Sequence, residues 1–168
     1  MLNLTPLRRK ARSTLAVAAA ALLGLAAAHA HLDASDPADR AVVTEPLTEL
    51  TLTFTEPVEA EFSRFELVRL DVETSPDGYA TGGAAWALLD EAAKAAHDEL
   101  VAQGTAPRAA GDDAPYTLTV QTTGASDEVV LTVEGELPAG DYILFFNALS
   151  VDTHTTSGYV LFSYQPEY

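Results

Sequence analysis

The chain has 168 residues, with 25 acidic and nine basic side chains and a formal net charge of −16 at pH 7. All acidic residues follow residue 30, so the later part carries 25 acidic against five basic residues, a net charge of −20. Such a charge argues against a nucleic-acid-binding protein, because the phosphate backbone would repel it. The absence of cysteine excludes disulfides, thiolate metal sites and cysteine nucleophiles.

The first thirty residues have the layout of a secretory signal peptide. Four basic residues come first, residues 15–28 form an apolar run, and small residues in A-x-A spacing lead to Ala30. The apolar run is too short to span a bilayer comfortably. We expect residues 1–30 to be cleaved, which leaves a soluble domain at 31–168 in the periplasm or outside the cell. Cleavage after Ala28 would leave a different amino terminus.

Further along the chain, several short segments alternate apolar and polar residues, as half-buried strands do. One is expected directly after His31, and the others are 50–55, 62–70, 116–122, 129–133, 142–147 and 159–164. Turn signals such as Asp36-Pro37 and Ser157-Gly158 separate them. About seven short strands with little helix between them predict an all-β antiparallel sandwich or barrel.

One region, about 71–115, interrupts this pattern. It begins and ends with loop-like sequence, and 84–103 between has strong helix propensity. The apolar face of the expected helix is formed by Trp86, Leu89, Ala93, Ala96 and Leu100, and Gly104 is a plausible stop. We expect an inserted α-helix that packs on the sandwich through its Trp86 face.

Cleavage after Ala30 would make His31 the first residue, and its free amine and imidazole can chelate one metal ion. His154 supplies a second imidazole, and Asp152, two residues earlier, supplies an oxygen. A site of this nitrogen and oxygen composition suits Cu(II). The only methionine is Met1, which is lost with the leader, so a thioether site for Cu(I) cannot form.

Two further residues, Glu56 and His97, have side chains that can bind a metal ion. Glu56, before Pro57, is a possible axial or outer carboxylate, although an ordinary strand-end residue explains it equally well. His97 is expected to be a solvated residue on the polar side of the inserted helix.

Several motifs make the chain resemble the CopC family of periplasmic or secreted copper-binding proteins. They are Ala30-His31-Leu32, residues 35–39 (SDPAD), residues 50–59 (LTLTFTEPVE), residues 138–142 (PAGDY) and residues 147–158 (NALSVDTHTTSG). The specific part is the Asp-x-His segment paired with an amino-terminal histidine. The resemblance covers roughly 31–70 and 116–166.

This resemblance implies an Ig-like Greek-key β-sandwich that holds one Cu(II) ion through His31, Asp152 and His154. It also implies copper resistance or homeostasis rather than catalysis, and an inner-membrane partner of the CopD type. The chain lacks the methionine-rich loop of some members, and its insertion is longer than their usual loop. Two alternatives remain: a copper-dependent monooxygenase with an amino-terminal histidine brace, and a metal-free structural sandwich.

Overall fold

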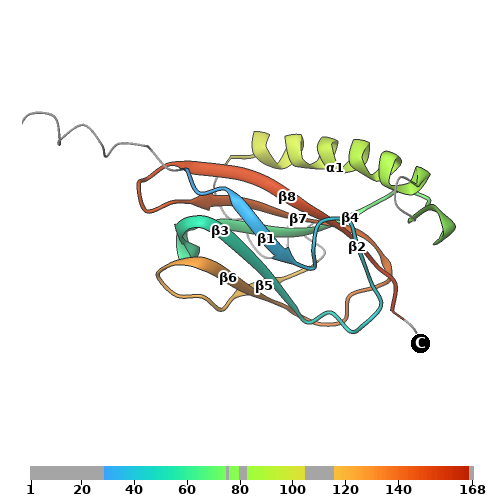
Figure 1. Cartoon of the computed structure of the whole chain (residues 1–168), viewed down its shortest axis with the longest axis horizontal. Coiled ribbons are helices and arrows are strands. Elements are labelled where there is room, and N and C mark those ends of the chain that lie inside the picture. The colour runs from blue at the N-terminus through green and yellow to red at the C-terminus, as the bar shows by residue number, and fades with distance from the viewer. Residues whose placement is uncertain (1–28, 75, 80–82, 105–115, 167–168) are drawn as a thin grey trace, which may run out of the picture.

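The computed structural model describes residues 29–74, 76–79, 83–104 and 116–166; the rest of the expected leader, 1–28, lies outside the described residues. The chain forms two β-sheets with one long helix across the outer face of one of them (Figure 1). The elements are β1 (Leu32–Asp36), β2 (Ala41–Val43), β3 (Glu49–Glu59), η1 (Ala60–Phe62), β4 (Arg64–Leu70), η2 (Pro76–Tyr79), α1 (Ala84–Ala102), β5 (Leu118–Val120), β6 (Ala125–Val133), β7 (Gly140–Leu149) and β8 (Thr155–Tyr164). The predicted sandwich with an inserted helix is confirmed.

Each sheet has four strands, in the orders β1-β3-β6-β5 and β2-β8-β7-β4. Neighbouring strands are antiparallel, except that β2 runs parallel to β8. The chain changes sheets five times, between β1 and β2, β2 and β3, β3 and β4, β4 and β5, and β6 and β7, and such crossings are typical of Greek-key sandwiches. The sequence predicted about seven strands, and the additional one is β2, whose three residues are too few to show an alternating pattern.

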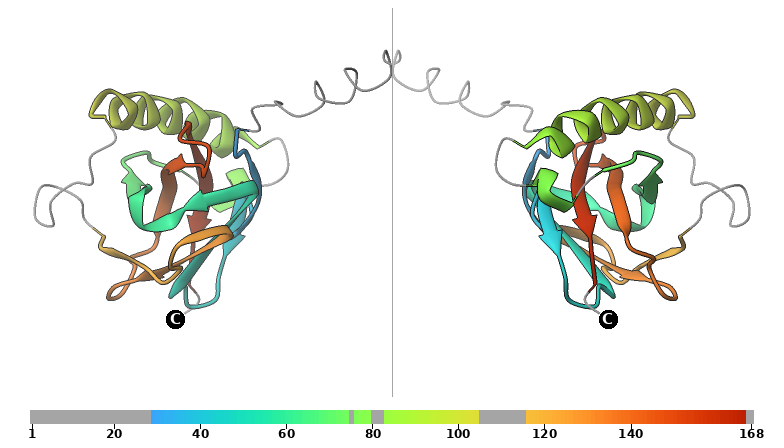
Figure 2. Two further views of the ribbon diagram at one scale, coloured as in Figure 1. Left: turned by 90° about the vertical axis from the view of Figure 1, so that its left-hand side faces the viewer. Right: turned by 90° about the vertical axis from the view of Figure 1, so that its right-hand side faces the viewer.

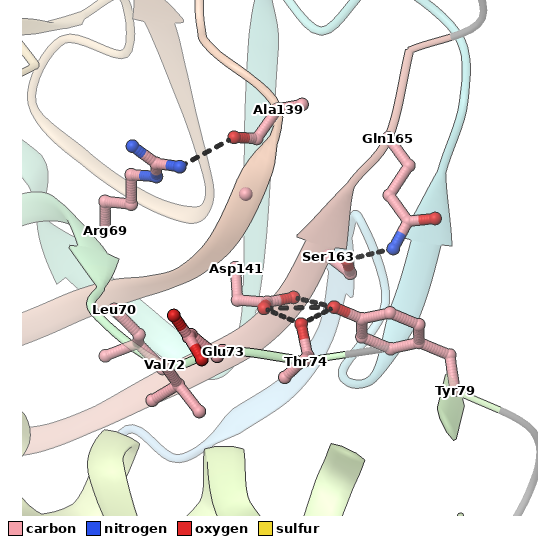
Figure 3. A pocket seen from close by; sticks show the side chains of 11 residues that line it. Arg69, Leu70, Val72, Glu73, Thr74, Tyr79, Ala139, Asp141, Ser163 and Gln165 are labelled. Carbon is pink, nitrogen blue, oxygen red and sulfur yellow. Dashed lines mark hydrogen bonds between the residues drawn. The ribbon is translucent and has the colours of Figure 1, made fainter. Parts of the chain in front are cut away.

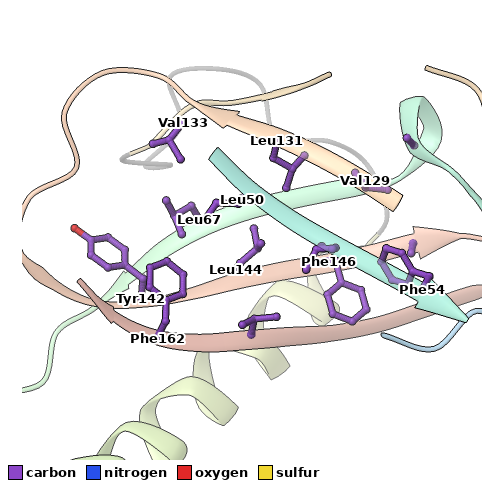
Figure 4. Packing of buried hydrophobic residues seen from close by; sticks show 14 of the residues in the cluster. Leu50, Phe54, Leu67, Val129, Leu131, Val133, Tyr142, Leu144, Phe146 and Phe162 are labelled. Atoms are coloured by element: carbon purple, nitrogen blue, oxygen red, sulfur yellow. The ribbon is translucent and has the colours of Figure 1, made fainter. Parts of the chain in front are cut away.

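The main core lies between the two sheets and is built from alternate residues of facing strands (Figure 4). In β3, Leu50, Leu52 and Phe54 point inwards and are at most 3% exposed. Phe54 meets Phe146 of β7 edge to face, with 5.4 Å between the ring centroids. Burial of apolar surface stabilises by roughly 25 cal/mol per Å², so this alternation decides which face of β3 turns inwards.

Strand β7 is buried on both faces, which explains why its sequence is a continuous apolar run. Tyr142, Leu144 and Phe146 belong to the main core, whereas Ile143 and Phe145 belong to a second cluster under the helix. All five side chains are at most 3% exposed. A strand that is covered on both sides loses the apolar–polar alternation of a half-buried one.

Helix α1 covers the outer face of the second sheet (Figure 2). Its span and its Trp86 face were predicted correctly. The buried helix residues are Ala85, Trp86, Leu89, Ala93 and Leu100. Gly104 follows with φ = 85°, a left-handed conformation that suits glycine after a helix. Within the part of the chain that the structure describes, no helix is both long and apolar enough to cross a membrane.

The prediction that His97 is a solvated residue was wrong. Its side chain is only 20% exposed, and its ring centroid lies 5.8 Å from that of Phe145 and 5.4 Å from that of Tyr159. Position 97 follows Ala93 by four residues, so it lies on the same, buried face of the helix. His97 therefore belongs to the packing of α1 on the sheet.

Arg64 of β4 fastens the end of α1 to the second sheet, and it also forms a buried ion pair with Glu66 of the same strand. Nε of Arg64 lies 2.5 Å from Oε1 of Glu66, and the two side chains are 2% and 8% exposed. The same guanidinium donates to the carbonyls of Leu100, at 3.0 Å, and Gly104, at 2.6 Å. These carbonyls lie at the end of the helix, where no intrahelical donor reaches them.

Candidate metal centre

The predicted ligands lie at one end of the sandwich, where the residues before β1 meet the loop between β7 and β8. His31 is fixed to β3 through Thr55: its backbone N–H donates to Thr55 Oγ1 at 3.0 Å, and its carbonyl accepts the Thr55 N–H at 2.8 Å. On the other side, the Val151 N–H donates to the Pro57 carbonyl at 3.3 Å. Strand β3 thus holds both the amino-terminal segment and the loop that carries Asp152 and His154.

Three imidazoles gather at this end. The ring centroids of His29 and His154 are 4.9 Å apart, and those of His29 and His31 are 6.5 Å apart. His29 was assigned to the leader by the sequence, and it is the residue that the sequence interpretation missed. The side chain of His154 is 53% exposed, so a metal ion from solution can reach it.

Asp152 and His154 are adjacent because the loop makes a tight turn, not because they share one face of a strand. Nδ1 of His154 lies 3.0 Å from Oδ2 of Asp152, and the His154 N–H donates to Oδ1 at 3.1 Å. Thr153 between them has φ = 72°, which is strained for a β-branched residue. With its proton on Nδ1, the imidazole presents Nε2 to a metal ion.

The carboxylate of Asp152 is stabilised by donors from its own loop. The Ser150 hydroxyl donates to Oδ1, and the His154 backbone N–H donates to the same oxygen. These bonds, the hydroxyl first, lower the pKa of Asp152 from 3.8 to about 2. The group is therefore an anion throughout the physiological pH range, as a carboxylate ligand must be.

No three His, Asp or Glu side chains among residues 29–74, 76–79, 83–104 and 116–166 stand ready-made around one metal position. One of the predicted donors is the amine of a cleaved amino terminus, whereas in the structure the His31 nitrogen is a peptide N–H. Glu56 is exposed and lies in β3 between Thr55 and Pro57, the two residues that hold the flanking segments.

A separate groove of about 540 Å³ lies at the opposite end of the second sheet (Figure 3). Asp141, which is 4% exposed, accepts hydrogen bonds there from the hydroxyls of Tyr79, at 2.8 Å, and Thr74, at 2.9 Å. These bonds tie the first part of the insertion to β7. The groove is not part of the metal centre.

The model of the CopC domain matches residues 32–165 of the chain. The chain belongs to the CopC family. This assignment, expected from the motifs, connects the protein with copper, and the predicted family is confirmed. No curated protein matches the chain.

Solved structures of similar fold include two of PcoC, a methionine-rich copper resistance protein from Escherichia coli. One has 21% identity and a TM-score of 0.52 and covers 82% of this chain and 100% of that chain. The other, of selenomethionine PcoC, has 18% identity and a TM-score of 0.51 and covers 80% and 99%. CopC from Methylosinus trichosporium OB3b has 19% identity and a TM-score of 0.47, and covers 83% and 97%. At these identities the likeness to PcoC concerns the fold.

Proposed function

We propose that this CopC-family protein is exported and binds one Cu(II) ion per chain, which it sequesters or delivers outside the cytoplasmic membrane. The observation that carries the proposal is the meeting of the amino-terminal segment with the Asp-x-His loop, where the rings of His29 and His154 are 4.9 Å apart. Segments more than a hundred residues apart in the sequence thus bring imidazole nitrogens and a carboxylate to one exposed end.

The available donors favour Cu(II). His31 and His154 offer imidazoles, Asp152 offers an anionic oxygen, and a cleaved amino terminus offers an amine; Glu56 is a candidate outer ligand. Nitrogen and oxygen donors in tetragonal geometry suit Cu(II), which also heads the affinity order of the divalent metals. A cysteine or methionine site for Cu(I) has no donor in this chain once Met1 is removed.

The proposal has two forms, which differ in the first residue of the mature chain. Cleavage after Ala30 makes His31 the amino-terminal donor, as the sequence predicted. The burial of Ala30, which is 0% exposed and belongs to the main core, supports cleavage after Ala28 instead. Ala30 then stays in the core, His29 supplies the amine and an imidazole beside His154, and His31 remains as an additional imidazole.

The experiment that tests both forms starts with the intact mass of the exported protein, which gives its first residue. Proteins that begin at His29 and at His31 are then titrated with Cu(II), each beside a version with one added residue in front. We expect one equivalent to bind tightly to one of them with a nitrogen-rich tetragonal EPR signal, and the added residue to abolish that signal. Weak binding by every form would contradict the proposal.

Cu(II) affinity should also fall as the pH is lowered from 7.5 to 5.5, because protons compete for the amine and the imidazoles. Asp152 does not contribute to this fall, because its pKa of about 2 keeps it ionised at both pH values. Competition titrations at the two pH values measure the effect. An affinity that does not change between them would contradict ligation by nitrogen.

We also propose that the protein binds copper without catalysis and hands it to an inner-membrane transporter of the CopD type. The alternative monooxygenase needs an open equatorial position for oxygen, which an Asp152 ligand would occupy. Incubation of the copper-loaded protein with ascorbate should therefore give no more peroxide than free copper does. Sustained peroxide production or oxidation of chitin or cellulose would favour the enzyme.

A further inference from the structure

The loop between β7 and β8 is organised around one buried residue. Ser150 is 3% exposed, whereas residues 151–154 are all exposed. Its N–H donates to the His154 carbonyl at 2.8 Å, and its own carbonyl accepts the Thr153 N–H at 2.9 Å. Ser150 also forms a bridge with Val58 of β3, so its backbone is fixed to the opposite sheet.

We propose that Ser150 is a positioning residue of the copper site, whose hydroxyl holds the Asp152 carboxylate in place before the metal arrives. This inference rests on the proposed function. Two acceptors lie within reach of the single Ser150 hydroxyl proton, Oδ1 of Asp152 and the His154 carbonyl at 3.1 Å from Oγ. The hydroxyl therefore links an exposed carboxylate to a backbone that is hydrogen-bonded within the loop and bridged to β3.

The remaining contacts of Asp152 explain why such a hold matters. Its side chain is 34% exposed on a turn, and a carboxylate in that position is otherwise free to rotate into solvent. With Oδ1 held by Ser150 and by the His154 N–H, Oδ2 stays beside the His154 ring. The left-handed Thr153 completes the turn, and backbone strain of this kind is often found at binding sites.

Removal of an outer partner of a metal ligand commonly lowers metal affinity by about 10- to 100-fold. We therefore expect Ser150→Ala to lower Cu(II) affinity by roughly tenfold or more and to change the EPR hyperfine splitting. Ser150→Thr, which keeps the hydroxyl, should recover much of the loss. The matched control is Ser163→Ala, at the far end of β8 and 0% exposed, which should leave the affinity within about twofold.

The decisive test is a double-mutant cycle with Asp152→Asn. If Ser150 acts through the carboxylate, Ser150→Ala should cost little further affinity once Asp152 has been replaced. An equal loss in both backgrounds, or an unchanged EPR signal in Ser150→Ala, would overturn the inference. Ser150→Gly serves as a second variant if the alanine protein unfolds, and thermal unfolding of each metal-free protein checks this.

The cycle also separates this inference from the proposed function. If the unsubstituted protein with its mature amino terminus binds no Cu(II), both fail together. If it binds Cu(II) tightly and the cycle shows no coupling between Ser150 and Asp152, only the positioning role fails.

Discussion

The buried pair of Arg64 and Glu66 gives the sharpest test of what holds the inserted helix on the sandwich. Arg64→Met keeps much of the length of the side chain and removes the guanidinium. The Glu66 side chain, 8% exposed, then loses that cation, and the carbonyls of Leu100 and Gly104 lose a donor. Breaking a buried pair from one side costs about 3–5 kcal/mol, so we expect the free energy of unfolding to fall by that amount.

The chain offers a matched control in its exposed arginine pair. Nη2 of Arg40 and Oδ1 of Asp90 lie 2.8 Å apart, but the two side chains are 52% and 44% exposed. Arg40→Met should therefore lower the free energy of unfolding by no more than about 1 kcal/mol. Urea unfolding followed by circular dichroism measures both variants, provided that the slope with denaturant is unchanged.

A third protein, with Arg64→Met and Glu66→Leu together, should recover most of the stability that Arg64→Met loses, because no charge then remains buried. Equal, small losses for Arg64→Met and Arg40→Met would refute the reasoning, since burial would then make no difference to the pair. A double variant as unstable as Arg64→Met would show that the lost helix contacts matter and the charge does not.

Three further substitutions test the rest of the molecule. Leu89→Ala removes a fully buried side chain from beneath the helix and should lower the free energy of unfolding by about 2–5 kcal/mol in urea; a loss below 1 kcal/mol would show that the helix packs loosely. Gly158→Ala would place a Cβ 2.5 Å from Cζ of Phe146 in the core, and we expect a cost of about 1–3 kcal/mol, seen as a lower Tm; an unchanged Tm would contradict this. Burial raises the pKa of Tyr142, so the folded protein holds the phenol proton more tightly than the unfolded chain does. Its contribution to stability is complete below about pH 10 and declines as the pH rises further. Tyr142→Phe should weaken this alkaline loss between about pH 10 and 12 in urea unfolding, and an equal loss in both proteins would argue against it.

The fold was predictable wherever apolar residues recur at a regular spacing over several residues. The buried face of the helix, formed by Trp86, Leu89 and Ala93, follows from the spacing of its apolar residues alone. In β3, the alternation of apolar and polar residues shows which side chains point into the core. Strand β2 was not predictable, because its three residues are placed by pairing with β8, more than a hundred residues away. His97 is polar, as surface residues of a helix usually are, but its position four residues after Ala93 places it on the buried face.

The residues of the candidate site could be chosen from the sequence but their arrangement could not, and their role as metal ligands stays a prediction. The loop with Asp152 and His154 could be recognised from its residue types and from the family resemblance. Whether His29 or His31 lies nearer to His154 depends on the path of the chain before β1, which no periodic pattern encodes. The left-handed turn at Thr153 was equally hidden, because β-branched residues rarely adopt it.

The enclosure of Ala30 in the core limits when the chain could be cut after this residue. A peptidase needs several extended, accessible residues on either side of the bond that it cuts. Once β1 has paired with β3 and Ala30 is enclosed, the peptide bond after Ala30 no longer meets that condition. A cut at this bond would therefore have to take place before the sandwich closes, on a chain that is still unfolded around Ala30.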